Sequence, residues 1–334
     1  MDDPAQAEPP PTIFPAGLVA SPSFDDFESM AAAARGWDHH YLKLSPGRFR
    51  GRIEMAHTGR MQLALADWSC GILASGSVPA GAVTFGMVAG STMPARHAGV
   101  AMRGDQLGWV ADRDELHLLH PQGCQLIVLS LMREWLDEMA ATVLGEPWAV
   151  AVGTAPVLDL RDGQALEAEL RRLHAVAIRS EPAALCRPGH AVGLERAAAE
   201  AVLSRLRLPP RRVGACERRR LARRTEDYLR ANDSRCVTIA ELCAAVGASE
   251  RTLHAACREY FGLPPIAFLR TVRLHGARRQ LRERRPEASV TTIAMDWGFY
   301  HFGEFAASYR RLFGEPPSRT LRAATGGAGG RRAG

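Results

Sequence analysis

Two stretches in the C-terminal part of the chain carry side chains that could hydrogen-bond to the edges of DNA bases. In the first stretch, the positions expected to face outward are Ser249, Glu250, Arg251, His254 and Ala255. Arg251 is the strongest candidate, because a bidentate contact between arginine and guanine contributes about 1–3 kcal/mol of discrimination between bases. His254 could donate to guanine or to a phosphate, and we expect Arg258 to contact phosphate.

The second stretch offers different chemistry. Its expected outward-facing residues are His301, Phe302, Gly303, Glu304, Ala307, Arg310 and Arg311. Glu304 could accept from the N4 amino group of cytosine. Equally, it could pair with Arg310 or stabilise a helix start, where an acidic side chain is favoured. Phe302 could contact a thymine methyl group, and Gly303, which costs a helix up to about 1 kcal/mol relative to alanine, could allow close approach to the DNA backbone.

The pattern of apolar residues and helix ends predicts the elements that hold these side chains. Apolar residues recur at helical spacing at Ile239, Leu242, Val246 and Leu253, and again at Ile293, Trp297, Phe305 and Tyr309. Gly247 and Gly298 stand where a first helix must stop, a position that favours positive φ. Ser249 can cap the helix that follows. The chain therefore predicts two helix-turn-helix motifs, roughly 50 residues apart.

A basic helix is expected to join the two motifs. Pro264 and Pro265 favour a helix start, and Pro286 ends the helix. The span Ile266–Arg284, about 19 residues, would be roughly 28 Å long, which approaches the one-turn repeat of DNA of about 34 Å. Its arginines, which we expect on phosphates, are Arg270, Arg273, Arg278, Arg279, Arg282, Arg284 and Arg285.

These motifs resemble those of the AraC/XylS family of transcriptional regulators. The run from Ile293 to Ser318 resembles the family's signature, and Ser249–Arg282, which includes Phe261-Gly262-Leu263-Pro264-Pro265, resembles its first motif and linker helix. Gly298-Phe299, followed by His301-Phe302-Gly303, resembles the branch that contains ethanolamine-operon regulators. The resemblance implies a promoter-DNA-binding regulator with an N-terminal cupin-like sensor domain, a small-molecule effector and RNA polymerase as a partner.

Charge is divided unevenly along the chain. The whole chain has a net charge of +6. Residues 207–334 contain 25 Arg and 12 Asp+Glu, giving +13, and residues 1–206 contain 17 Lys+Arg and 24 Asp+Glu, giving −7. The basic C-terminal part is the one expected to meet phosphates. Lys43 is the only lysine, a bias that base composition explains better than function does.

Composition also narrows the compartment and the chemistry. The seven cysteines show no CxxC pair, which predicts reduced thiols in a cytoplasm and no zinc site. No apolar run is long enough to span a membrane, and the acidic, proline-rich N-terminus is unlike a secretory signal. We therefore expect a cytoplasmic, nucleoid-associated protein with no membrane contact.

The predicted fold class is α+β with several domains. Residues 1–20 are expected to form a disordered leader, 21–206 a cupin-like β-barrel with flanking helices, 207–216 a linker, 217–323 an all-α domain with both motifs, and 324–334 a flexible tail. Alternating segments at 52–55, 61–68, 82–88 and 124–130 predict strands, and a helix is expected at 24–35. Helices at 164–178 and 190–206 could pair two subunits through 164–206 or pack within the domain.

An effector pocket is expected inside the strand-rich domain. Trp37, Trp68, Phe85, Arg96 and Trp109 could line it, because such cavities are mostly apolar with few polar groups. The alternative, that each aromatic residue simply fills the core, is favoured for any single one. His117 and His120 are three residues apart and so on opposite faces of a strand, unlike the alternating pair of a metal-binding cupin. No metal, cofactor or catalytic residue is expected.

The sequence thus predicts a sequence-specific DNA-binding transcription regulator, an activator as in much of the family, controlled by an effector. Two alternatives stay open. The N-terminal part could be an enzyme, an alkyl-transfer or cupin metalloenzyme domain, fused to a DNA-binding domain. The chain could also bind DNA without any ligand. Our expectation is that it is not an enzyme.

Overall fold

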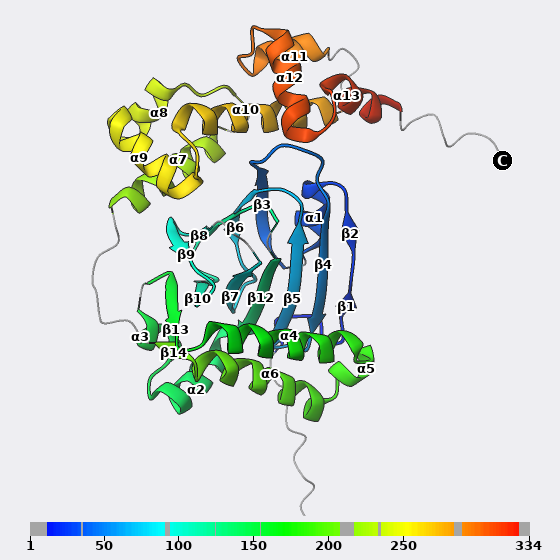
Figure 1. The fold of residues 1–334 in the computed structure, drawn as a ribbon, viewed down its shortest axis with the longest axis vertical. Helices are drawn as coiled ribbons and strands as arrows, with labels where there is room; N and C mark the ends of the chain where they lie inside the picture. Colours follow the sequence, from blue (N-terminus) through cyan, green and yellow to red (C-terminus); the bar gives the residue numbers. More distant parts are fainter. Residues whose placement is uncertain are drawn as a thin grey trace, which may run out of the picture.

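The structure of the protein is a computed structural model, and it describes residues 12–34, 36–90, 94–123, 125–153, 155–207, 217–232, 235–283 and 289–326. An N-terminal part rich in strands lies against a C-terminal part made of helices (Figure 1). The expected α+β organisation is confirmed.

Within the residues that the structure describes, the larger of two sheets has nine strands in the order β1-β4-β5-β12-β7-β10-β13-β14, with β2 paired to β4. The strands are β1 (Val19–Ala20), β2 (Ser23–Phe24), β4 (Gly51–His57), β5 (Met61–Trp68), β7 (Ala82–Ala89), β10 (Gln106–Ala111), β12 (Gln125–Met132), β13 (Val157–Leu160) and β14 (Leu206–Arg207). The strands predicted at 52–55, 61–68 and 82–88 are confirmed. The predicted strand 124–130 corresponds to β12, and Cys124 lies outside the described residues.

The smaller sheet, in the described part of the chain, has five strands in the order β3-β6-β11-β8-β9. They are β3 (Asp38–Lys43), β6 (Ile72–Ser77), β8 (Ala95–His97), β9 (Val100–Met102) and β11 (Leu116–His120). Side chains of both sheets, among them Ile53, Met55, Ala74 and Leu118, share one buried cluster. Across the described residues the strands form two separately hydrogen-bonded sheets, so the predicted closed, cupin-like barrel is not confirmed.

Helices cover the outer face of the larger sheet. They are α2 (Arg133–Leu144), α3 (Trp148–Val152), α4 (Gly163–Arg179), α5 (Pro182–Leu185) and α6 (Pro188–Leu203). Asp162 caps α4 by accepting from the Ala165 N–H. Leu166 and Leu170 of α4 and Val202 of α6 are buried in the cluster formed with that sheet. The apolar faces of the predicted helical pair therefore pack within the domain.

The N-terminal boundary differs from the prediction. Residues 12–20 were expected within a disordered leader, yet Phe14 is buried and its N–H donates to the Gly59 carbonyl at 2.9 Å. Val19–Ala20 pairs with β4. Burial of apolar side chains is enough to hold this segment in place despite Pro15. Helix α1 (Phe27–Ala33), capped by Asp26, follows, within the predicted range 24–35.

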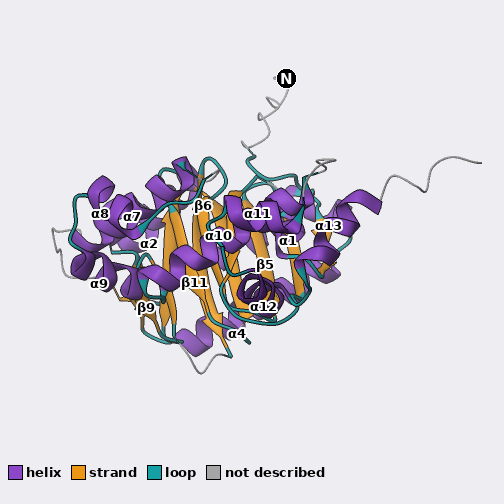
Figure 2. Ribbon diagram, turned by 90° about the horizontal axis from the view of Figure 1, so that it is seen from above, coloured by secondary structure: helices purple, strands orange, loops and turns teal. Residues whose placement is uncertain are grey.

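The C-terminal helices form a row above the sheets (Figure 1). They are α7 (Glu217–Ala231), α8 (Ile239–Val246), α9 (Glu250–Phe261), α10 (Pro265–Arg282), α11 (Val290–Asp296), α12 (Phe302–Phe313) and α13 (Pro317–Gly326). Figure 2, seen from above, shows α10, α11 and α12 lying over the strands. Residues 208–216 of the predicted linker and 327–334 of the predicted tail lie outside the described residues, whereas α13 continues to Gly326.

Candidate DNA-binding surface and effector cavity

The first helix-turn-helix motif, α8 and α9, forms where the sequence places its caps and its stop. Thr238 caps α8 by accepting from the Glu241 N–H, and Ser249 caps α9 by accepting from the Thr252 N–H. Gly247 ends α8 in the left-handed region with φ of 64°, a conformation that costs glycine little. Leu253 is fully buried between these helices and the rest of the domain. The predicted motif is confirmed in its local structure.

The N-terminal end of α9 faces solvent. All six candidates of this motif are exposed, namely Ser249, Glu250, Arg251, His254, Ala255 and Arg258. The opposite face carries Ala256, Cys257, Tyr260 and Phe261, which are buried. A helix that presents its first turns outward in this way can enter a major groove with Arg251 leading.

The second motif, α11 and α12, is built in the same way. Ser289 caps α11 by accepting from the Thr292 N–H, and Gly298 follows it with φ of 73°. The candidates of this motif are all exposed: His301, Phe302, Gly303, Glu304, Ala307, Arg310 and Arg311. In the described part of the chain, Glu304 makes no ion pair with Arg310, so the acidic side chain stays available at the helix start.

Tight packing fixes α11 on α10. The ring of Trp297 lies so close to Gly276 that an added Cβ would overlap it. The Trp297 indole N–H donates to Gln280 Oε1 at 2.8 Å, and the Gln280 amide donates to Asp296 at 3.1 Å. Helix α10 has 18 residues, about 27 Å at 1.5 Å per residue. It therefore holds the two motifs at a set separation, as the sequence predicted.

Two arginines of α10, Arg278 and Arg282, form ion pairs with acidic side chains of the strand-rich part. Arg278 donates to Asp26 Oδ1 at 2.8 Å, and its guanidinium lies 5.0 Å from the Phe27 ring centre and 4.9 Å from that of Phe313. Arg282 pairs with Asp26 and Glu28. These two side chains join α10 to α1 of the strand-rich part. Arg284 and Arg285 lie outside the described residues.

Two further arginines of α10 bond within the helical part. Arg273 donates to the Val237 carbonyl at 2.8 Å, and Arg270 donates to Ser308 Oγ at 2.8 Å. Arg273 is half-buried and Arg270 is exposed. Their bonds brace the first and the second motif, respectively, so a phosphate contact by either stays a prediction.

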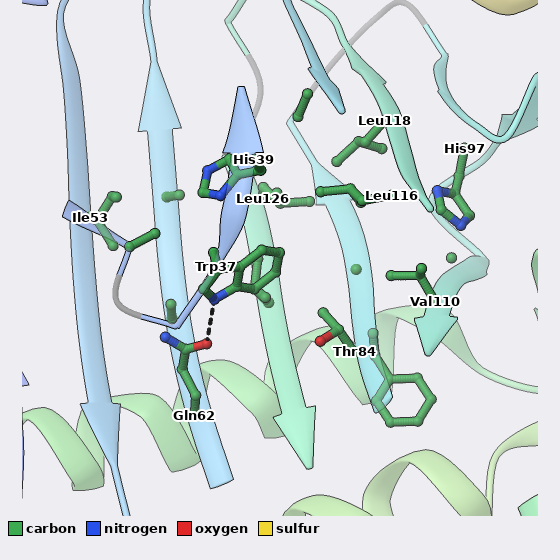
Figure 3. A pocket seen from close by; sticks show the side chains of 18 of the residues that line it. Trp37, His39, Ile53, Gln62, Thr84, His97, Val110, Leu116, Leu118 and Leu126 are labelled. Atoms are coloured by element: carbon green, nitrogen blue, oxygen red, sulfur yellow. Dashed lines mark hydrogen bonds between the residues drawn. The ribbon is translucent and has the colours of Figure 1, made fainter. Parts of the chain in front are cut away.

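A cavity of about 90 Å³ lies between the two sheets (Figure 3). Trp37, Trp68, Phe85 and Trp109 line it, as predicted residues of an effector pocket. Phe85 and Trp109 also pack against Trp148, with ring centres 5.0 and 5.4 Å apart, so they serve the core as well. Arg96 is not among the lining residues. Its guanidinium donates to the carbonyls of Gly99 and Glu259, both at 3.0 Å.

The smaller sheet separates this cavity from the helices above it. Because side chains alternate along a strand, Ala74, His97 and Leu116 line the cavity while their neighbours face the helical part. Of these neighbours, Arg96 holds the last turn of α9 through Glu259, and His117 lies 4.2 Å from the Tyr260 ring centre. His120, on the other side of β11 as predicted, packs on Trp68 at 4.3 Å.

Glu226 of α7 is a buried acid in this contact. It lies 3.3 Å from His117 Nε2 and accepts a hydrogen bond from Ser75. Burial raises the pKa of the Glu226 carboxyl to about 7, and the nearby charge of Glu115 adds to the rise, whereas Ser75 and Arg230 oppose it. Arg230 also donates to Glu115 at 3.0 Å. The sequence offered no signal for this group, since Glu226 sits in an ordinary charged helix.

The only lysine of the chain anchors α12. Lys43, at the end of β3, is 1% exposed and donates to the carbonyls of Ser45, at 2.6 Å, and Leu312. Desolvation lowers its pKa. His275 of α10 donates to the Lys43 carbonyl at 3.2 Å, and the Gly47 N–H donates to the Arg311 carbonyl at 3.0 Å. The sequence shows that Lys43 is the only lysine of the chain, but it does not predict this structural role.

The second helix of each motif, α9 or α12 (the recognition helices), is therefore held at its C-terminal turn and exposed at its N-terminal turn. In the described ranges no three His, Cys, Asp or Glu side chains gather in a way that could hold a metal ion. Nor does the described chain contain a helix that is long and apolar enough to cross a membrane.

Comparison with known proteins agrees with this geometry. A protein-family model described as a helix-turn-helix domain matches residues 242–323. A probable thc operon regulatory protein of Rhodococcus erythropolis is 37% identical over 103 residues, which are 30% of this chain and 31% of that protein. XylDLEGF operon transcriptional activator 1 of Pseudomonas putida is 34% identical over 100 residues, 30% of each chain. The match thus spans about a third of the length of these curated relatives.

Among solved structures, a probable AraC family transcriptional regulator from Rhodopseudomonas palustris is 39% identical, with 31% of this chain and 97% of that chain covered and a TM-score of 0.29. With two complete helix-turn-helix motifs, a connecting helix that sets their separation, and regulators as its relatives, this chain is a member of the AraC/XylS family of transcriptional regulators.

Proposed function

We propose that the protein is a sequence-specific DNA-binding activator of transcription whose DNA affinity is set by a small molecule bound between the two sheets. DNA binding is supported by one observation: both recognition helices are exposed at their N-terminal turns, while their opposite faces are buried. The activator role is proposed because the XylDLEGF relative is named a transcriptional activator. Such a protein acts on promoter DNA in the cytoplasm, in contact with RNA polymerase.

The two motifs divide the work of recognition. Arg251 and His254 of α9 offer hydrogen-bond donors to bases. The start of α12 offers Phe302, which is 42% exposed, and Tyr300, which is 74% exposed. Apolar contact with thymine methyl groups and with the sugar–phosphate backbone is the chemistry open to these rings. The first motif therefore supplies most of the base discrimination.

The position of the smaller sheet supports effector control. One face of it lines the cavity, and the other holds α9 through Arg96 and touches Tyr260 through His117. The end of β3 holds α12 through Lys43. A ligand that shifts β3 or β8 by a fraction of an ångström moves the anchored ends of both recognition helices. Differential affinity for two such arrangements is all that effector control requires.

A selection experiment tests the DNA-binding half of the proposal. The full chain selects sites from a random duplex pool, and fluorescence anisotropy then compares the selected site with a scrambled duplex at several salt concentrations. Specific binding tighter than scrambled binding by about 10³-fold or more is expected, with a salt slope that reports the number of phosphate contacts. Equal affinity for both duplexes contradicts specific recognition. Transcription with purified RNA polymerase then decides between activation and repression.

Assembly through residues 164–206 is a separate proposal. The buried faces of α4 and α6 pack on their own sheet, so only their outer faces can pair subunits. Val176 of α4 and Val192 of α6, 39% and 40% exposed, supply apolar contact there. Sedimentation of the full chain and of a variant with both valines changed to Asp tests it. A homodimer that the double change dissociates supports pairing there, and a monomer at all concentrations contradicts it.

A further inference from the structure

The residues that line the cavity between the sheets determine which kind of ligand it can bind. They are formed by strands of both sheets, and Figure 3 shows Trp37, His39, Gln62 and Thr84 around the space together with aliphatic side chains. Beyond the aromatic residues already named, the walls are mainly Ile, Leu, Val, Ala and Met. Such a surface binds by burying apolar area.

The described walls hold no charged partner for an ion. No Arg, Lys, Asp or Glu is among the lining residues of the part of the chain that the structure describes. Desolvation lowers the pKa of the His39 imidazole to about 4, helped by the neighbouring His40 and opposed by Asp38. Burial likewise raises the pKa of the Tyr41 phenol. Both side chains are therefore neutral near pH 7, so an ionised ligand would lose its hydration and gain no counter-charge from either of them.

Most polar groups in the walls are already used. Gln62 accepts from the Trp37 indole N–H at 2.9 Å and its amide lies 3.0 Å from His57. Thr84 shares a hydrogen bond of 2.8 Å with Ser130. The Trp109 indole donates to the Ala155 carbonyl at 2.6 Å.

Two wall residues stand apart from this pattern. The indole Nε1 of Trp68 and the Nδ1 of His39 are buried and have no hydrogen-bond partner in the described ranges. Trp68 is only 4% exposed. A buried N–H without an acceptor costs about 1–3 kcal/mol, so an acceptor brought by a ligand would recover part of that cost.

The volume sets an upper limit on size. A cavity of about 150 Å³ lined by aliphatic and aromatic side chains is known to hold benzene, and this one is about 90 Å³. A single ring therefore fits only when the walls yield slightly. Met55 and Met102 line the cavity, and flexible methionine side chains can change rotamer to make room for a ring.

We propose that this cavity binds an uncharged, mainly apolar molecule no larger than one ring with a small substituent, and that a single acceptor on it takes the Trp68 indole N–H. The inference rests on the proposed function only in calling this molecule the effector. It separates the protein from regulators that respond to a cationic amine. Protonated ethanolamine, suggested by the sequence resemblance, would find no carboxylate in the described walls.

Thermal unfolding of the full chain with four probes tests the ligand class. Toluene and benzonitrile are uncharged and differ by an acceptor, whereas benzoate and benzylamine are charged at pH 7. Benzonitrile is expected to raise Tm most and toluene less, with a difference in affinity of roughly two- to tenfold, as one net hydrogen bond provides. Benzoate and benzylamine are expected to leave Tm unchanged. A charged probe that stabilises as well as benzonitrile, or no shift with either neutral probe, overturns the proposal.

Two variants place the probe in this cavity. Ala66→Leu fills the space and should abolish the shift with both neutral probes, while Trp68→Phe removes the N–H and should make toluene and benzonitrile equivalent. An unchanged preference for benzonitrile in Trp68→Phe contradicts the role of the indole. DNA affinity is measured separately. If benzonitrile binds but leaves DNA affinity unchanged, the ligand class is supported and effector control is what fails.

Discussion

Replacing Arg278 with alanine should loosen the strand-rich part of the protein from α10. The guanidinium makes one charge-assisted hydrogen bond to Asp26 and lies over two rings, and the side chain is only 11% exposed. Such a bond contributes about 1.5–3 kcal/mol, and each cation–π contact about 0.5–1 kcal/mol or more when desolvated. Arg278→Ala should therefore lower the free energy of unfolding by about 3–4 kcal/mol.

Arg282→Ala is the matched control for this change. Arg282 lies on the same helix and pairs with the same acid, but it is 41% exposed, so its loss should cost at most about 1 kcal/mol. Urea unfolding followed by tryptophan fluorescence gives both values, and amide exchange of α1 and α10 reports where the loosening occurs. A cost for Arg278→Ala no larger than that for Arg282→Ala would refute the reasoning that burial makes this contact strong.

The state of Asp26 gives an independent view of the same contact. Burial by itself would raise the pKa of the Asp26 carboxyl. Hydrogen bonds from Ser29 and the charges of Arg278 and Arg282 outweigh that effect, so its pKa is lowered. In Arg278→Ala the burial remains while part of the compensation is lost. The carboxyl should then titrate at a higher pH than in the unaltered protein, which carbon-detected NMR of the carboxyl can follow.

Two further changes test the packing around the helical part. The pKa of Glu226 in the folded protein is raised to about 7 from 4.5, so the protonated carboxyl stabilises the fold below pH 4.5 and this stabilisation is lost as the pH rises through 7. Relative to Glu226→Gln, the unaltered protein should lose up to about 3 kcal/mol of unfolding free energy over that pH window. A difference in urea unfolding between the two proteins that does not change with pH would contradict this expectation. Gly276→Ala should destabilise the second motif, because the new Cβ overlaps the Trp297 ring. The control is Gly303→Ala, where the added Cβ meets open space, and this change should stabilise α12 by up to about 1 kcal/mol. If thermal unfolding ranks the two glycine changes in the opposite order, the close packing of Trp297 on Gly276 is contradicted.

The two helix-turn-helix motifs were predictable because their signals are local. A Ser or Thr before each first helix, glycines at the turns, and apolar residues at helical spacing all act within a few residues of one another. Gly247 and Ser249 take the conformations and bonds that the sequence implied. The exposure of Arg251 follows from the same spacing.

Contacts between the two parts of the chain were not predictable in this way. Ser75, Arg96 and His117 meet the helices only because they lie on one face of a sheet whose strands are far apart in sequence. The spacing of the α10 arginines predicts contacts with phosphates, yet Arg278 and Arg282 pair with Asp26, which caps α1, and Arg282 also pairs with Glu28. Charge pattern alone does not show whether a cation faces DNA or a carboxylate of the same chain.

The residues that line the cavity between the sheets were predicted in part. Trp37, Trp68, Phe85 and Trp109 do line one cavity, because large aromatic residues of alternating strands tend to face the space between two sheets. Arg96 could not be placed without knowing which face of β8 points inward. The register of that strand, which pairs with β11, decides it.

The most direct test of the account is the DNA preference of three proteins: the unaltered chain, Arg251→Ala and Arg310→Ala. Competition between a selected site, its single-base variants and random duplex gives the affinity of each. We expect Arg251→Ala to lose about 1–3 kcal/mol of discrimination at one base position, and Arg310→Ala to bind every duplex more weakly by a similar factor. Equal effects of both changes on selected and random DNA, or no preference in the unaltered protein, would contradict the central claim.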